Sequence, residues 1–377
     1  MSSRVYFADP RAGHRENLYG KLERLLEECG LGGVIAPGDL TAVKIHFGER
    51  GGHAYIRPTF IRRVVDKIRS HGGKPFLTDS CTLYPGERKE AVSALRCGIE
   101  NGFDFAVAGA PLVICDGLRG HSARRIHVPG GMLEQGVDIA TGILDADAMV
   151  CVSHFKCHEL TGIGGAIKNL GMGCSSRTGK MEQHSNVAPQ VSESSCTGCA
   201  ACLKACAHDA IRIVEKKAQI DADLCVGCGR CIAVCEEGAI RIQWNEAPAR
   251  VMHKMAEYAT GAVQDKGAKS LYVNFVTQVS PACDCYGHSD SPIVADVGLL
   301  ASLDPVALDQ ACADLVNQAP GLVGTALKNG HEPGGDKFRG VHPDIPWEAT
   351  LEQAEKLGLG SRSYELITLQ PKHPKGW

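Results

Sequence analysis

Two short cysteine runs constrain this chain more than any other feature of its sequence. The spacing C-x2-C-x2-C-x3-C occurs from Cys196 to Cys206 and again from Cys225 to Cys235. Each run places three thiolates on one tight loop, where they can hold three corners of an iron-sulfur cube, and the fourth thiolate comes from farther away. The spacing therefore predicts two [4Fe-4S] clusters in an electron-handling protein. Zinc is the alternative, but zinc sites favour C-x2-C pairs separated by longer spacers.

The repeat extends past the cysteines. The sequence AIRI follows the first run at residues 210–213 and recurs after the second run at residues 239–242, which indicates an internal duplication. In both copies two isoleucines flank an arginine, and this alternation predicts a short half-buried strand. Together, residues 192–244 resemble the two-cluster ferredoxin module of bacteria.

That resemblance implies a ligand set in which the last cysteine of each run binds the cluster of the other run. The first cluster would be held by Cys196, Cys199, Cys202 and Cys235, and the second by Cys225, Cys228, Cys231 and Cys206. The ferredoxin family usually places proline after the fourth cysteine, where this chain has Ala207 and Glu236. We expect this difference to alter the stiffness of the loop rather than the ligation.

Composition narrows the setting in which such clusters would work. A net charge of -3 provides no basic field to attract nucleic acid or an anionic membrane. No stretch reaches the roughly 20 apolar residues of a membrane helix, and the N-terminal residues lack an apolar signal core, so we expect a cytoplasmic protein. In a reducing compartment, 18 cysteines indicate metal binding rather than disulfides. Because such clusters are oxygen-sensitive, we expect an anaerobic or low-oxygen setting.

Strand and helix patterns alternate on both sides of the cysteine runs. Buried strands are predicted at residues 40–47, 74–78, 148–153 and 269–276, and helices at residues 58–71, 88–101, 133–143 and 247–264. This rhythm predicts an α/β fold with a mostly parallel sheet and flanking helices, interrupted by a small α+β two-cluster ferredoxin-like domain. The body would comprise residues 1–190 and 246–377, with the insertion at residues 191–245.

Two segments of the predicted body carry an unusual density of reactive side chains. In VKIHFGERGGH, Lys44 and His46 lie two residues apart and so face the same side of a strand. In the segment 151–174, three reactive residues leave the carboxyl end of a predicted strand, where open α/β sheets place their ligands, and a lysine follows the next glycines. These four residues are His154, Cys157, His158 and Lys168. Solvated strand ends and helix packing are the simpler explanations for both segments.

A third segment, PACDCYGH, brings Cys283, Asp284, Cys285 and His288 into one short loop. Two thiols that flank one residue can share a metal, form a strained disulfide or act as redox groups. Buried, inert thiols are the alternative. Asp79, at the end of another predicted strand, could orient a substrate or simply cap the next element.

These segments carry a second resemblance that covers almost the whole chain. AVKIHFGERGG, VSHFKCHELTGIGGAIKNLGMG, CDCYGHSDSPIVADVGLLASLDPVALDQA and WEATLEQAEKLGLGS resemble the iron-sulfur center proteins of the domain of unknown function 362 family. The resemblance implies that the α/β body is the family's own domain and that the ferredoxin unit is a recurrent insertion in it. It does not imply a particular reaction.

Three functions remain open at this point. In the first, an oxidoreductase passes low-potential electrons from two [4Fe-4S] clusters to a substrate or third cofactor in the body, either a further metal or a flavin. The residues expected at that site are Lys44, His46, His154, His158 and Lys168 for catalysis and Cys157, Cys283, Cys285 and His288 for the cofactor. The others are a non-catalytic electron-transfer adaptor and a scaffold that transfers a metal or cluster.

The expected partners follow from the same hypotheses. A redox partner protein or ferredoxin would exchange electrons with the clusters, and a small anionic substrate would suit the lysines and histidines. No nicotinamide site is expected, because glycines 162, 164 and 165 lack the G-x-G-x-x-G spacing after a strand.

Overall fold

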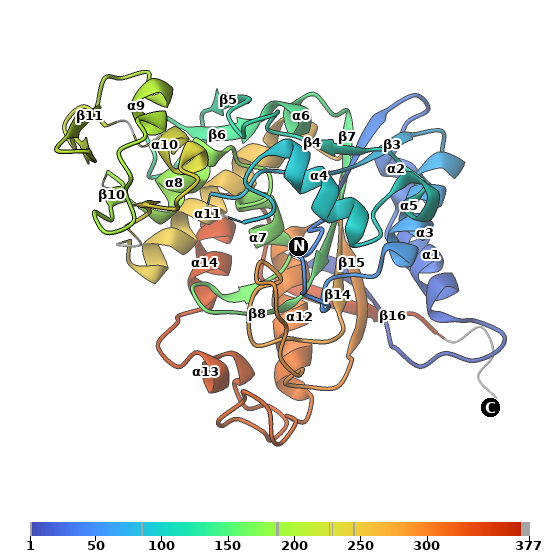
Figure 1. Cartoon of the computed structure of the whole chain (residues 1–377). Coiled ribbons are helices and arrows are strands. Elements are labelled where there is room, and N and C mark those ends of the chain that lie inside the picture. The colour runs from blue at the N-terminus through green and yellow to red at the C-terminus, as the bar shows by residue number, and fades with distance from the viewer. Residues whose placement is uncertain are drawn as a thin grey trace.

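The computed structural model describes residues 2–83, 86–185, 188–225, 227, 229–243 and 246–370. Its centre is an eight-stranded sheet in the order β16-β1-β15-β14-β7-β2-β3-β4 (Figure 1). The strands are β1 (Ser3–Ala8), β2 (Leu40–Lys44), β3 (Lys74–Asp79), β4 (Leu112–Ile114), β7 (Ala148–His154), β14 (Ser270–Val276), β15 (Gly298–Ser302) and β16 (Tyr364–Thr368). Neighbours from β14 to β4 pair in parallel, β16 pairs in parallel with β1, and β15 is antiparallel to both of its neighbours. The predicted α/β class with a mostly parallel sheet is confirmed.

Helices cover both faces of this sheet. One face packs on α1 (Leu18–Glu28), α2 (Leu31–Val34), α3 (Pro58–Ser70), α4 (Ala91–Glu100) and α5 (Phe105–Ala108). The other face packs on α7 (Ala166–Gly171), α11 (Pro248–Val263), α12 (Pro305–Gln318) and α14 (Glu348–Lys356). Because both faces are covered, the central strands β7 and β14 are buried along their whole length.

One predicted helix is wrong. Residues 133–143 contain β6 (Val137–Ala140), which pairs antiparallel with β5 (Ala123–Ile126), and the start of α6 (Thr141–Leu144). Gly136 has a φ of +82°, which a helix does not accommodate, and Val137 and Ile139 then alternate into the core as strand residues do. The alternation of buried and half-buried residues from Val137 to Ile139 therefore favours a strand over the helix that the apolar spacing suggested.

The cysteine runs lie in a small unit at one end of the molecule, in yellow-green in Figure 1. It contains the short helices α9 (Ala201–Ala205) and α10 (Arg230–Val234) and two two-stranded sheets. In these sheets β10 (Gln190–Val191) pairs with β13 (Ile240–Arg241), and β11 (Ile211–Val214) pairs with β12 (Lys217–Ile220). The strands predicted after each run are thereby confirmed. The unit has its own hydrophobic cluster, which Leu83 and Met181 of the body complete.

The remaining elements are β8 (Lys156–His158), β9 (Gly162–Gly164), α8 (Arg177–His184), α13 (Lys337–Val341) and a 3-10 turn at Gln264–Lys266. Within the described part of the chain, no helix is long and apolar enough to cross a membrane.

Candidate functional site

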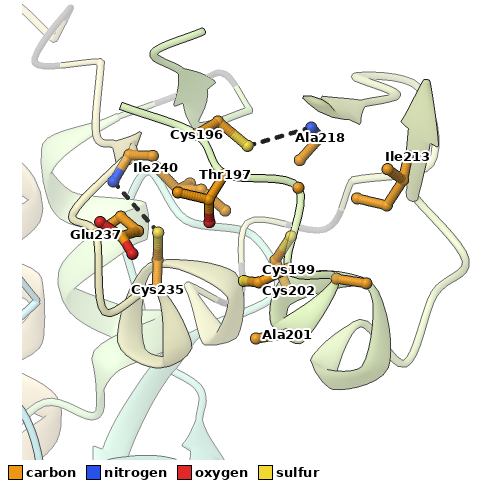
Figure 2. Close-up of a pocket in the computed structure, with 13 residues that line it drawn as sticks. Cys196, Thr197, Cys199, Ala201, Cys202, Ile213, Ala218, Cys235, Glu237 and Ile240 are labelled. Atoms are coloured by element: carbon orange, nitrogen blue, oxygen red, sulfur yellow. Dashed lines mark hydrogen bonds between the residues drawn. The ribbon is translucent and has the colours of Figure 1, made fainter. Parts of the chain in front are cut away.

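The cysteines of the first run surround a pocket with about 330 Å³ of empty space. Figure 2 shows Cys196, Cys199 and Cys202 of the first run together with Cys235, which ends the second run. Apolar groups such as Ile213, Ala218 and Ile240 complete the wall. The backbone amide of Ala218 donates to Cys196 Sγ at 3.4 Å, and that of Ala239 donates to Cys235 Sγ at 3.2 Å. The pocket therefore offers four thiols and amide donors in an apolar surrounding.

A second pocket, with about 360 Å³ of empty space, repeats this plan. It is lined by Cys225 and Cys231 of the second run and by Cys206, which ends the first run. Cys228, the remaining residue expected there, lies outside the described residues. In both pockets, a cysteine at the end of one run thus joins cysteines of the other run.

The two pockets have matching backbone geometry. Ala200 and Gly229 precede α9 and α10 at equivalent places, and both are left-handed, with φ of 60° and 68°. Two residues earlier, Gly198 and Gly227 have φ of +72° and +68°. The duplication in the sequence is therefore a duplication of loop conformation, including one left-handed alanine where the second copy has glycine.

The cysteines of both pockets could hold an iron-sulfur cluster. Within residues that the structure describes, no group of three or more histidine, cysteine or acidic side chains converges closely enough to hold a metal ion. A cube needs thiolates spread around an apolar space, with amide donors to their sulfurs, and the first pocket is lined by four cysteines and has two such donors.

A separate group of reactive side chains lies where the parallel strands of the body end. Lys44 ends β2 and is fully buried, with Nζ 2.9 Å from Asp79 Oδ1 and 2.6 Å from Asn169 Oδ1. Burial lowers the pKa of Lys44, but the charges of Asp79, Cys174 and Cys151 and the hydrogen bond to Asp79 together outweigh this effect, and the pKa is raised. A Cβ at Gly173 would lie 2.2 Å from Lys44 Nζ, so only glycine fits there.

His46 lies between an arginine and a cysteine. Its Nδ1 accepts a hydrogen bond from the backbone of Gly48 at 3.0 Å. Its Nε2 is 3.1 Å from Arg88 Nη1 and 3.4 Å from Cys285 Sγ. Arg88 is also buried and pairs with Glu49, with 3.1 Å between Nε and Oε2. Lys44 ends β2 and His46 lies beyond the end of that strand, and His46 is the one of the two that contacts Cys285.

The thiols of Cys283 and Cys285 are in direct contact. Their Sγ atoms lie 2.8 Å apart, and Lys168 Nζ lies 3.7 Å from Cys283 Sγ. The hydrogen bond from Cys283 lowers the pKa of Cys285 well below its usual value against the effect of burial, and His46 and Lys168 lower it further. The same hydrogen bond, together with burial, raises the pKa of Cys283. Cys285 is therefore the more acidic thiol of the pair.

Asp284, between the two cysteines, points into the protein and fixes the loop. Its carboxylate lies 2.9 Å from His154 Nδ1 and 3.2 Å from Lys156 Nζ. Burial raises the pKa of Asp284, but the charges of His154 and Lys156 outweigh it and hold the pKa well below its usual range. His154 Nε2 faces the carbonyl of Thr277 at 2.8 Å, so both of its ring nitrogens have hydrogen-bond partners.

Other expected site residues lie in different surroundings. Cys157 is buried in the main hydrophobic cluster, and burial raises its pKa. Burial, followed by the charge of Lys168, lowers the pKa of His158 well below its usual value. His288 is exposed and stacks on Tyr286, with ring centroids 5.3 Å apart, so it lies on the solvent side of the cysteine loop.

Sequence reasoning missed several residues of this group, namely Glu49, Arg88, Lys156, Asn169 and His184. His184 ends α8, and burial together with the charges of Lys168 and Lys180 lowers its pKa to about 3. Glu49, Lys156 and Asn169 lie within segments whose density of reactive side chains was already visible in the sequence, but their own contacts depend on distant residues. Arg88 and His184 lie outside these segments, and no short motif marks them.

Comparison with known proteins gives a family and a distant structural neighbour. The family model described as a domain of unknown function (DUF362) matches residues 41–314. No curated protein matches the chain. The structure of the lactate racemase apoprotein from Thermoanaerobacterium thermosaccharolyticum is similar over 73% of this chain, at 12% sequence identity and a TM-score of 0.36. The match spans 51% of the racemase, so the chain corresponds to about half of that protein's length.

Proposed function

The chain belongs to the domain of unknown function 362 family, and we propose that it is an iron-sulfur oxidoreductase that passes electrons from two [4Fe-4S] clusters to a site in its α/β body. In this proposal, residues 191–245 form the ferredoxin-like insertion. The clusters would supply one-electron transfer at low potential.

The observation that carries this proposal is the exchange of the fourth cysteine between the runs. Cys235 lines the pocket of the first run, and Cys206 lines the pocket of the second. A pair of independent zinc sites would use neighbouring C-x2-C pairs and would not require this exchange. The exchange matches the ligand set of two-cluster ferredoxins.

The chain also provides groups that would tune the clusters. The amides of Ala218 and Ala239 donate to cysteine sulfurs in the first pocket. Such donors stabilise the extra negative charge of the reduced state, so they favour reduction. Cys199 is exposed, which supports the first pocket as the place where a ferredoxin or another redox partner protein delivers electrons.

The second pocket lies against the body. A Cβ on Gly229 would be 3.2 Å from Leu83, and one on Gly227 would be 3.8 Å from Met181. Met181 belongs to α8, which ends at His184, and the charges of Lys168 and Cys285 act on His184. Helix α8 therefore connects the loop of the second pocket with the surroundings of the Cys283–Cys285 pair.

The body site suits an anionic substrate. Lys168 places positive charge beside Cys283, and Arg88, which also pairs with Glu49, lies beside His46. His46 would move a proton at Nε2, the nitrogen that faces Cys285 Sγ. His154 would position Asp284 rather than contact the substrate.

Metal analysis of anaerobically prepared protein tests this proposal. We expect about eight irons and eight acid-labile sulfides per chain, with electron paramagnetic resonance signals of two interacting reduced clusters. Cys235→Ala should lose the first cluster and keep the second, whereas Cys206→Ala should do the reverse. Cys29→Ala, which removes a buried thiol far from the runs in sequence, should keep both. Zinc in place of iron would overturn the proposal.

A further inference from the structure

The Cys283–Cys285 pair has the geometry of two thiols that are ready to join. A distance of 2.8 Å between their Sγ atoms is shorter than van der Waals contact between two sulfurs, so bond formation needs only a small approach. The loop cannot easily turn one thiol away, because Asp284 is held from inside by His154 and Lys156. The residue between the cysteines thus acts as an anchor.

The surrounding charges favour a thiolate over a bound metal cation. Lys168 Nζ is 3.7 Å from Cys283 Sγ, and Arg88 approaches the same nitrogen of His46 that faces Cys285. Fixed positive charges repel a metal ion but stabilise a thiolate, as in reactive cysteine sites.

The two cysteines also differ in access. Cys283 is 3% exposed, whereas Cys285 is partly exposed and carries the lowered pKa. In thiol–disulfide chemistry, the accessible thiolate attacks and the protected thiol resolves. Cys285 therefore faces the substrate, and Cys283 is its resolving partner.

On the basis of the proposed function, we propose that Cys283 and Cys285 form a dithiol–disulfide couple that collects two electrons from the two clusters. Each reduced cluster gives up one electron. The S–S bond breaks as it takes up both electrons and one proton from solvent, which leaves a thiol at Cys283 and a thiolate at Cys285. The couple thereby converts two single-electron deliveries into one two-electron reductant for an anionic substrate.

A reductive titration under anaerobic conditions tests the couple. Protein with oxidised thiols should take up about four electrons per chain, one for each cluster and two for the disulfide. Cys285→Ser and Cys283→Ser should each take up about two electrons with unchanged iron content. Cys29→Ala should still take up about four. In the oxidised protein, alkylation should leave Cys283 and Cys285 unmodified. Mass spectrometry should show the peptide that contains them about 2 Da lighter than its dithiol form, the mass of two hydrogens.

The outcomes separate this inference from the proposed function. Two electrons in the wild type, with both clusters present and both cysteines alkylated, would overturn the couple and leave the clusters intact. Iron or another metal that is lost in Cys283→Ser would overturn it in favour of a metal site. An uptake of two electrons that disappears in Cys285→Ser, in a protein without clusters, would retain the dithiol but exclude the clusters as its electron source.

Discussion

Lys44 Nζ lies 2.9 Å from Asp79 Oδ1, and the two side chains are buried where the neighbouring strands β2 and β3 end. Asn169 accepts a second hydrogen bond from Lys44 at 2.6 Å, and Arg88 lies 3.8 Å from the other carboxylate oxygen. This buried pair connects the ends of two strands to Asn169 of α7 and so stabilises the backbone that leads from β2 to His46. It is a structural support for the proposed redox site.

Replacing Lys44 with methionine should destabilise the protein strongly. Asp79 would remain buried without its closest positive charge, and this should lower the free energy of unfolding by about 3–5 kcal/mol. The matched control is Arg124→Met, which removes an ion pair with Asp145 in which the side chains are 56% and 67% exposed. That change should cost less than about 1 kcal/mol. Equal shifts of the thermal unfolding midpoint for the two variants would contradict this account of Lys44.

The left-handed residue before α9 predicts a stabilising substitution. Ala200 has a φ of 60°, a conformation that costs a residue with a Cβ about 1 kcal/mol and costs glycine little. Ala200→Gly should therefore raise the thermal unfolding midpoint of the cluster-loaded protein. Its counterpart Gly229→Ala should lower it, because the new Cβ is strained and lies 3.2 Å from Leu83.

Gly238→Ala separates the cost of the left-handed backbone from the cost of the contact with Leu83, which act together in Gly229→Ala. Gly238 has a φ of +59°, and no atom lies within 4 Å of a Cβ placed there. This variant should show the conformational cost alone, so it should be less destabilising than Gly229→Ala. A higher midpoint for Gly229→Ala than for Gly238→Ala would rule out close packing between the second cluster loop and Leu83.

His184 should make the protein sensitive to mild acid. Its pKa is lowered from 6.5 to about 3, so the folded state binds fewer protons than the unfolded state between these values. The contribution of His184 to the free energy of unfolding is complete above pH 6.5 and is lost as the pH falls, by about 2 kcal/mol at pH 5. His184→Gln should remove this part of the loss. Unfolding midpoints at pH 7.5 and pH 5 measure it, and an unchanged pH dependence in the variant would contradict the shift.

Local spacing predicted some features of this protein and long-range pairing determined others. The cysteine runs and the C-D-C loop could be found in the sequence because their members lie within a few residues of one another. The contact between His46 and Cys285 joins residues 239 positions apart. Such contacts depend on the order of strands in the sheet, and alternation of apolar residues alone does not give that order.

The missed elements have the same cause. Strand β16 lies at the edge of the sheet with a half-exposed pattern, so its sequence shows no apolar run. His184 ends α8, whose Met181 lies next to the loop of the second pocket, and the neighbours of His184 in sequence carry no motif. The sequence shows the spacing of the cysteines, whereas the fold decides which side chains surround them.

Anomalous X-ray scattering at the iron and zinc absorption edges, measured on crystals grown without oxygen, would identify and locate the bound metals. We expect two iron-containing peaks, one in the pocket of Cys196, Cys199, Cys202 and Cys235 and one in the pocket of Cys206, Cys225 and Cys231. We expect no metal peak at Cys283 and Cys285. Zinc in either pocket, or iron in one pocket only, would contradict the proposal of two iron-sulfur clusters.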